Sequence, residues 1–232
     1  MIKIEEHNAN KDNTYVQGVN QFTDLTQEEF IATYLNTKVN PKYTDSSIDV
    51  EAKPLLGADV DWSTAGKVSP VKNQGQCGSC WAFSATGAIE SAFRLADGNN
   101  QVLVSEQQLV DCSRSYGNQG CNGGWMDSAF QYVIDHGLTD STAYPYTARD
   151  GSCRIDSGTN KIRGFTDVPG CDNLMNALSA RPVAVAVDAS VWSGYRSGVL
   201  SNCGTAINHG VLLVGASDGF WKIKNSWGTS WG

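Results

Sequence analysis

The sequence of 232 residues lacks three features that mark common classes of protein. It has no run of Lys or Arg, and 17 basic residues stand against 24 acidic ones, giving a net charge of -7. A nucleic-acid partner is therefore not expected. No apolar stretch approaches the roughly 20 residues of a membrane-spanning helix, so no membrane partner is expected either. The opening "MIKIEEHNAN" contains no secretory signal, so the protein is expected not to be exported or to begin after its signal.

Histidine is also scarce, which argues against a metal site. The three histidines are His7, His136 and His209, and none lies in a close cluster with cysteine. A structural zinc site needs four ligands, usually from two C-x-x-C or C-x-x-H pairs. The sequence has one C-x-x-C, at Cys77 and Cys80, so we expect neither a metal nor a cofactor. There is no N-x-S/T sequon, and glycosylation gives no support for secretion.

Cysteine, by contrast, is plentiful. Seven cysteines are unusual in a reducing cytosol, and their odd number suggests three disulfides and one free, reactive thiol. The C-x-x-C could bind a metal, cycle as a redox pair, or combine a nucleophile with a structural cysteine. Residues 68–76 contain Pro and Gly and form no long strand, which disfavours a thioredoxin-like motif without excluding it.

The N-terminal segment, residues 1–55, differs in composition from the rest. It has no Cys or Trp, and a capping box from Thr26 to Glu29 predicts a helix through Leu35. Residues 36–54 are predicted to be an extended polar linker. A segment with so little core-forming material must dock on something else, although a loose N-terminal extension is the alternative.

The remaining sequence predicts helices first and strands later. Residues 80–96 predict a helix buried on several sides that Asp97–Gly98 ends. A second capping box begins a helix at Ser105, and residues 126–134 predict a helix that Gly137 ends. Strands are expected at 182–189, 209–216 and 220–227, the last two forming a hairpin. This order predicts an α+β fold with a helical lobe and an antiparallel β lobe.

The hairpin brings two polar residues together. A turn centred on Ser217 would place His209 directly opposite Asn225 on the same face of the hairpin. The amide oxygen of Asn225 could then orient the imidazole and leave its other nitrogen facing a thiol. This favours the interpretation of the C-x-x-C as a nucleophile beside a structural cysteine.

Several motifs now carry a family resemblance. "QGQCGSCWAF" (74–83), "NHGVLLVG" (208–215) and "KNSWGTSWG" (224–232) resemble the papain-like cysteine proteases, and "GCNGGWMDSAFQYV" (120–133) resembles their substrate-binding segment. "GVNQFTDLTQEEF" (18–30) is similar to the inhibitory propeptide of the cathepsin L-like branch.

The resemblance implies a papain-like fold of two lobes. Residues 56–165 would form a helical lobe with a central helix, 166–232 an antiparallel β-barrel lobe, and an active-site cleft would lie between them. Residues 1–55 would be a partial inhibitory propeptide, and the C-terminal strand is expected to be missing.

The resemblance also implies roles for individual residues. Cys80 would be the nucleophile, His209 its base and Asn225 the residue that orients His209. Trp227 would shield the His209–Asn225 bond, and Gln74 would donate to the oxyanion. Substrate-binding residues would be Gly123, Gly124, Trp125, Met126, Ala186, Ile207 and Asn208. Because this pocket has no carboxylate, a hydrophobic or aromatic P2 residue is expected. The implied disulfides are Cys77–Cys121 and Cys112–Cys153, and parity within the chain suggests Cys171–Cys203.

The function implied is a cysteine endopeptidase made as a propeptide-inhibited zymogen. Its partners would be protein and peptide substrates and its own propeptide, which would lie in the cleft. A monomer in a lysosome, a vacuole or outside the cell is expected, with activation cleavage near Leu56–Asp59. A catalytically silent homologue that binds or inhibits, and a C-x-x-C redox protein, are the alternatives.

Overall fold

The computed structural model describes residues 2–38, 59–96, 101–217 and 219–232, and of residues 2, 171 and 172 it describes the backbone only. The predicted helix end at Asp97–Gly98, most of the predicted linker, and residues 56–58 of the expected cleavage region lie outside this description.

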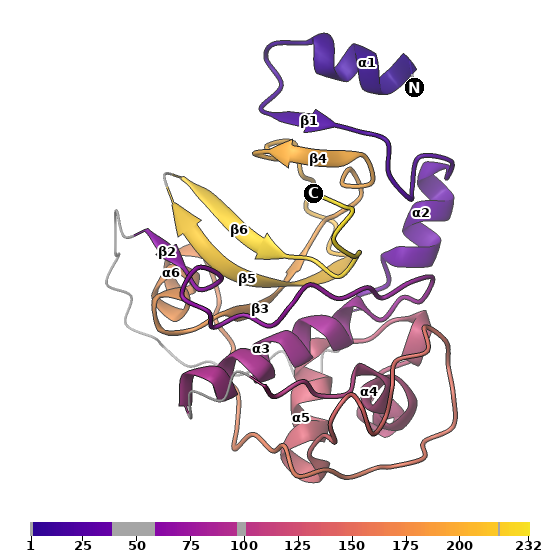
Figure 1. Cartoon of the computed structure of the whole chain (residues 1–232), viewed down its shortest axis with the longest axis vertical. Helices are drawn as coiled ribbons and strands as arrows, with labels where there is room; N and C mark the ends of the chain where they lie inside the picture. Colours follow the sequence, from indigo (N-terminus) through magenta and orange to yellow (C-terminus); the bar gives the residue numbers. More distant parts are fainter. Residues whose placement is uncertain (1, 39–58, 97–100, 218) are drawn as a thin grey trace.

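The long helix α3 (Cys80–Ala96) lies between the two lobes, as Figure 1 shows. On one side it packs against α4 (Glu106–Cys112) and α5 (Met126–His136) of the helical lobe. On the other side it packs against the sheet, where Gly87 lets Leu212 approach closely: a Cβ at Gly87 would lie 3.1 Å from the Leu212 side chain. The buried faces of α3 explain its all-round apolar sequence, and the helix predicted at 80–96 is confirmed.

The β lobe is an open antiparallel sheet around β5 (His209–Ser217). β3 (Val183–Val187) and β2 (Val60–Asp61) pair with β5, and so does β6 (Phe220–Lys224). The α+β class is confirmed, but the expected barrel is wrong, because the described strands do not close on themselves. The early strand β2, from the segment assigned to the helical lobe, also belongs to this sheet.

The predicted hairpin register is wrong. Ser217 pairs with Phe220, so the turn lies later than expected, and a bulge follows between Leu213 and Gly215. Leu212 therefore pairs with Lys224, and Asn225 lies beyond the end of β6. A later turn and a bulge each shift the cross-strand partners, which is why the register from sequence failed.

The sequence analysis missed several elements. Helix α6 (Cys171–Ala180) packs against β3 and β5, although only strands were predicted beyond residue 160. The short strands β1 (Tyr15–Gln17) and β4 (Tyr195–Gly198), which pair with each other, were also missed. Helix α1 (Ile2–Ala9), which precedes β1, contains Ile4 and Asn8, and these match the end of the long helix motif of the resembled propeptide. The 3-10 turns at Ser113–Tyr116 and Gly120–Asn122 connect α4 to α5.

Two helices begin at the predicted capping boxes, but only one box is complete. At α2 (Gln27–Tyr34), Thr26 accepts from the backbone of Glu29, and the Glu29 side chain accepts from the backbone of Thr26. At α4, Ser105 caps the helix, whereas the Gln108 Oε1 accepts from the Thr139 N–H instead of from the cap. The second box is therefore half-formed, because tertiary contacts compete for Gln108.

Two disulfides hold the loops of the helical lobe. They join Cys77 to Cys121 and Cys112 to Cys153, the pairings implied by the resemblance. The third expected pairing is wrong, because Cys203 is a free thiol. The Cys203 sulfur accepts a hydrogen bond from the Trp192 indole, which lies near the start of β5. Helix α6, which begins at residue 171, packs toward the other end of β5.

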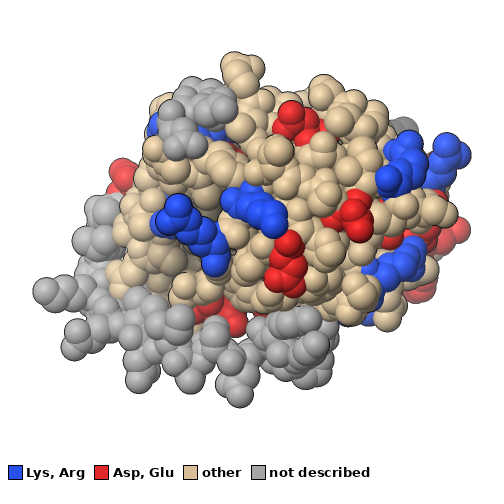
Figure 2. Space-filling view, turned by 90° about the horizontal axis from the view of Figure 1, so that it is seen from below, with Lys and Arg blue, Asp and Glu red and all other residues tan. Residues whose placement is uncertain are grey.

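The surface shows no segregation of charge on the face drawn in Figure 2, where Lys and Arg lie among Asp and Glu. None of the helices in the described part of the chain combines the length and the apolarity of a membrane span. Within the same residues, no group of three or more His, Cys, Asp and Glu side chains could hold a metal ion.

Candidate active site

Cys80 is the first residue of α3 and is completely buried. The Cys77–Cys121 disulfide and a hydrogen bond from Gly78 N–H to the Cys121 carbonyl (2.9 Å) fix the loop before it. At a helix start, backbone N–H groups lack intrahelical acceptors, and the helix dipole favours a negative charge. Cys80 thus lies where a thiolate is stabilised.

His209, at the start of β5, lies on the opposite side of the site and is also fully buried. Its Nε2 is 2.8 Å from Asn225 Oδ1, although the two residues are not paired in the sheet. The Trp227 ring lies 4.7 Å from the imidazole and covers it, and Trp227 is 1% exposed. The three residues predicted to act together are therefore in contact.

The thiol of Cys80 is more acidic than an ordinary cysteine. Burial raises its pKa, but the charge and close approach of His209 lower it more, helped by the Thr37 hydroxyl and the Gly210 N–H, so that the pKa is about 7. His209 Nδ1 has no hydrogen-bond partner at normal distance among the described residues. The imidazole therefore acts on the sulfur mainly through its charge.

Gln74 is held firmly beside this pair. Its backbone N–H donates to the Ser226 carbonyl (2.8 Å), and its Oε1 accepts from the Ser226 hydroxyl (2.7 Å). With Oε1 engaged, Nε2 faces the N-terminal segment, where it donates to the Tyr34 carbonyl at 3.1 Å, and it also donates to the Cys77 carbonyl at 3.0 Å. The amide is thus oriented as a donor toward a carbonyl in the site.

The N-terminal segment runs through the site between the lobes. Thr37 N–H donates to the Asn208 carbonyl of the β lobe (3.0 Å), and Lys38 N–H donates to the Gly124 carbonyl of the helical lobe (3.0 Å). Thr37 also lies with its Oγ1 3.0 Å from Cys80 Sγ. The described part of this segment therefore docks on the rest of the chain, as expected, and the alternative of a loose N-terminal extension is excluded for it.

The glycine pair of the predicted substrate strip lies against this segment. Gly123 has a φ of +111°, and a Cβ there would lie 2.0 Å from the Asn36 carbonyl oxygen. A Cβ on Gly124 would collide with the Trp81 ring at 2.6 Å. Gly123 therefore needs to be glycine for the close approach of the N-terminal segment, and Gly124 for the close packing of Trp81.

The other predicted binding residues differ in exposure. Met126 is buried and close to Gly210, whereas Ile207 is 46% exposed. Trp125 is partly buried, and its indole donates to Asp127 at 2.6 Å. Asn208 is held by the Ser190 hydroxyl at 2.8 Å. Ala186 pairs with Gly210 across β3 and β5 and is partly buried against the helical core.

Three residues near the site had no signal that the sequence analysis used. Thr37 falls in the stretch predicted as polar linker. Ser226 bonds Gln74 and donates its N–H to Asn225 Oδ1 (2.8 Å). Tyr146 donates its hydroxyl to the Gln74 carbonyl (2.7 Å). Only the position of Ser226, next to Asn225 in the sequence, could have drawn attention to it.

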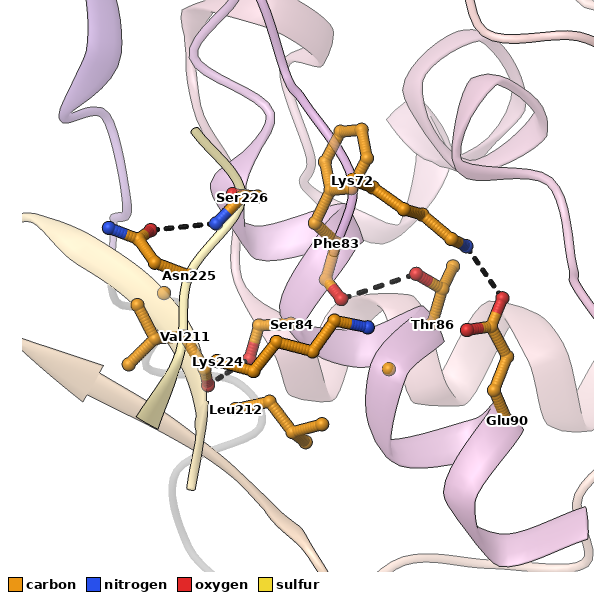
Figure 3. A pocket seen from close by; sticks show the side chains of 12 residues that line it. Lys72, Phe83, Ser84, Thr86, Glu90, Val211, Leu212, Lys224, Asn225 and Ser226 are labelled. Carbon is orange, nitrogen blue, oxygen red and sulfur yellow. Dashed lines mark hydrogen bonds and ion pairs between the residues drawn. The ribbon is translucent and has the colours of Figure 1, made fainter. Parts of the chain in front are cut away.

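A buried cluster of charges lies behind Asn225, between α3 and β6. Lys224 donates to the Ser69 hydroxyl (2.9 Å), which donates to Glu90. Lys72 is 2.6 Å from the other oxygen of Glu90 and also bonds Glu106. Figure 3 shows Lys224 extending from β6 toward α3 beside a cavity of about 10 Å³. The cluster joins the two lobes.

The charges in this cluster balance one another. Burial lowers the pKa of Lys72, but Glu106 and Glu90 outweigh burial and raise it. Burial raises the pKa of Glu106 against the pull of Lys72. Burial lowers the pKa of Lys224 to about 8. A buried ion is tolerated only with partners: Lys72 pairs with both carboxylates, whereas Lys224 reaches Glu90 through the Ser69 hydroxyl.

Comparison with known families decides what this arrangement belongs to. The family described as "Papain family cysteine protease" matches residues 56–232. The chain belongs to the papain family of cysteine proteases. A second family, "Cathepsin propeptide inhibitor domain (I29)", matches residues 1–30. This papain-family protease therefore carries an inhibitor domain on the same chain and is a zymogen.

The relatives place the protease in the cathepsin L-like branch. Cathepsin L 2 of Paramecium tetraurelia is 52% identical over 224 residues, which cover 94% of this chain and 71% of that protein. Digestive cysteine proteinase 3 of Homarus americanus is 46% identical and covers 99% of this chain and 76% of its own. Digestive procathepsin L 3 of Tenebrio molitor superposes with a TM-score of 0.88 at 43% identity, covering 100% of this chain and 80% of its own. The papain-like fold is confirmed.

Proposed function

We propose that this protease hydrolyses peptide bonds with Cys80 as nucleophile and His209 as its acid and base. The observation that carries the proposal is the constellation of a buried thiol with a pKa of about 7 and an imidazole bonded to Asn225. A thiol with an ordinary pKa would be protonated at neutral pH and a poor nucleophile.

The proposed reaction has two steps. The Cys80 thiolate attacks the carbonyl carbon, and His209 gives a proton to the departing amine, which leaves an acyl-enzyme. Water then attacks the thioester while His209 takes its proton, and the acid and the free thiol are released. Asn225 keeps Nδ1 of His209 directed toward sulfur by binding Nε2, and Trp227 excludes water from that bond.

We propose that Gln74 Nε2 and the backbone N–H of Cys80 stabilise the oxyanion. The hydrogen bond from Gln74 Nε2 to the Tyr34 carbonyl supports this role, since a propeptide carbonyl occupies the donor. The Ser226 hydroxyl keeps the amide in this orientation by occupying its oxygen. Such preorganised donors act most strongly on the charge that develops in the transition state.

The proposed substrates are proteins and peptides that bind in extended form along Gly123 and Gly124. The backbone carbonyl of Gly124 already accepts a hydrogen bond from the propeptide, which supports main-chain recognition there. Met126 and Ala186 supply apolar side chains near Gly210, so we propose a hydrophobic or aromatic P2 residue. We further propose a monomer that acts in a lysosome-like compartment or after secretion.

Labelling with a peptidyl epoxide tests the proposal. The protease freed of its propeptide is treated at mildly acidic pH and mapped by mass spectrometry. Label on Cys80 alone, with Cys77 and Cys121 still bridged, is the expected result. Absence of label, or a Cys77–Cys80 disulfide, would instead favour the silent homologue or the redox protein.

Replacing Gln74 with alanine is expected to lower kcat/KM by about 10²–10³-fold, because one oxyanion donor is lost. The effect should fall on kcat, since the donor acts on the transition state. Peptide hydrolysis by the processed protease measures it, and an unchanged kcat would remove Gln74 from the proposed machinery. Gln119→Ala is the matched control, because this amide is exposed and its oxygen accepts from the exposed Lys38 side chain of the propeptide.

A further inference from the structure

We propose that Thr37 of the propeptide caps the Cys80 thiolate with its hydroxyl, so that the zymogen keeps a formed nucleophile but separates it from its oxyanion donor. The inference rests on the proposed function, because it assigns a second role to the same thiol. It concerns a single atom, Oγ1 of Thr37, 3.0 Å from Sγ.

The backbone holds Thr37 in this place from both lobes. Its own N–H is bound by Asn208 and that of Lys38 by Gly124, so the residue between these bonds cannot slide along the cleft. Thr37 is 5% exposed, and Cys80 is completely buried. Water therefore cannot easily replace the hydroxyl as the hydrogen-bond partner of sulfur.

The direction of the hydrogen bond follows from the charge of the sulfur. A thiolate can only accept, so the hydroxyl must donate to it. A buried anion needs hydrogen-bond donors, and the Thr37 hydroxyl acts on this thiol together with His209 and the Gly210 N–H. The Thr37 hydroxyl lowers the pKa of Cys80, as a donor to the charged form does.

The same segment occupies the oxyanion donor with a different residue. In a productive complex one carbonyl group presents its carbon to sulfur and its oxygen to the donor. Here the Tyr34 carbonyl is bound to Gln74, while Thr37 faces the thiolate with a hydroxyl. Because these contacts come from separate residues, sulfur has no activated carbonyl to attack. This explains how the propeptide can fill the site without being cut there.

The substitution Thr37→Val tests the contact in the full chain, since valine has the shape of threonine without the hydroxyl. Iodoacetamide reaches Cys80 only when the segment opens, so its rate of labelling reports the opening equilibrium. A hydrogen bond to a charged group is worth about 1.5–3 kcal/mol, so Thr37→Val should label about 10–100-fold faster. Mass spectrometry of chains that retain the propeptide gives the rate.

Two further variants identify the cause. Thr37→Ser keeps the hydroxyl and should label at about the parental rate. Thr33→Val also replaces a hydroxyl by a methyl group in the same segment. Thr33 is a suitable control because it makes no side-chain hydrogen bond to any residue that the structure describes. Parental labelling by Thr37→Val, or equal acceleration by Thr33→Val, would overturn the proposal.

A double-mutant cycle tests whether the hydroxyl acts on sulfur. Thr37→Val should lower the unfolding midpoint of the full chain, but in a Cys80→Ala background it should lower it no more than Thr33→Val does. An equal loss in both backgrounds would place the effect elsewhere and overturn the proposal. Failure of the proposed function is separate, because it would appear as missing epoxide label on the processed protease, which lacks Thr37.

Discussion

Replacing Cys80 with alanine in the processed protease is expected to lower peptide hydrolysis by about 10⁶-fold, as the loss of a catalytic nucleophile does in a comparable triad. Without the thiol no acyl-enzyme can form, and His209 has no nucleophile with which to act as acid and base. The remaining activity should come from the oxyanion donors and substrate binding alone. Initial rates with a fluorogenic peptide measure the loss.

The second free thiol gives the control for this substitution. Cys203 is exposed and lies in the loop between β4 and β5, where it accepts from the Trp192 indole. Cys203→Ser should leave the rate within about twofold, because its sulfur bonds the Trp192 indole and not His209 or Asn225, whose side chains bond each other. If Cys80→Ala kept appreciable activity while Cys203→Ser lost it, the assignment of the nucleophile would be wrong.

Replacing Glu90 with glutamine is expected to destabilise the protein by about 3–5 kcal/mol, the usual cost of removing one partner of a buried ion pair. Glu90 is completely buried and accepts from Lys72 (2.6 Å), from Ser69 and from the Val104 N–H (3.0 Å). Glutamine keeps the shape of the side chain, but its amide N–H groups would face groups that are themselves hydrogen-bond donors. Lys72 would then keep Glu106 as its single carboxylate partner.

Urea unfolding of the full chain measures this loss. Lys222→Gln is the matched control, because Lys222 forms an ion pair with Asp61 at 2.8 Å and its side chain is 48% exposed. An exposed pair contributes about 0–1 kcal/mol, so its midpoint should hardly change. Equal midpoints for Glu90→Gln and the parent would mean that the buried cluster does not stabilise the fold.

Much of the fold could be predicted because its elements are locally specified. The central helix followed from an apolar sequence on several faces, and α5 followed from its spacing and from Gly137, which has a φ of +76°. Helix α6 was missed because its identity depends on packing against β3 and β5, which its sequence does not display. The strand β4 was missed for the same reason, since its partner is β1, far away in the chain.

The site was predictable to the extent that it rests on residue types in order. Cys80, His209, Asn225 and Gln74 were identified by motif, and the structure brings them together. Their contact did not follow from the predicted register, because Asn225 reaches His209 with its side chain from beyond β6. Thr37 could not be identified, because a hydroxyl in a polar stretch carries no pattern until the chain folds back onto the cleft.

The two-stranded sheet of β1 and β4 depends on the presence of the propeptide. One strand lies within the inhibitor domain and the other within the protease domain, so neither domain contains the sheet by itself. Removal of the propeptide therefore does more than uncover an existing surface: it abolishes one element of secondary structure. Tyr195–Gly198 then becomes an unpaired edge, with backbone donors and acceptors directed outward. The backbone hydrogen bonds of this short segment therefore differ between the full chain and a protease freed of its propeptide.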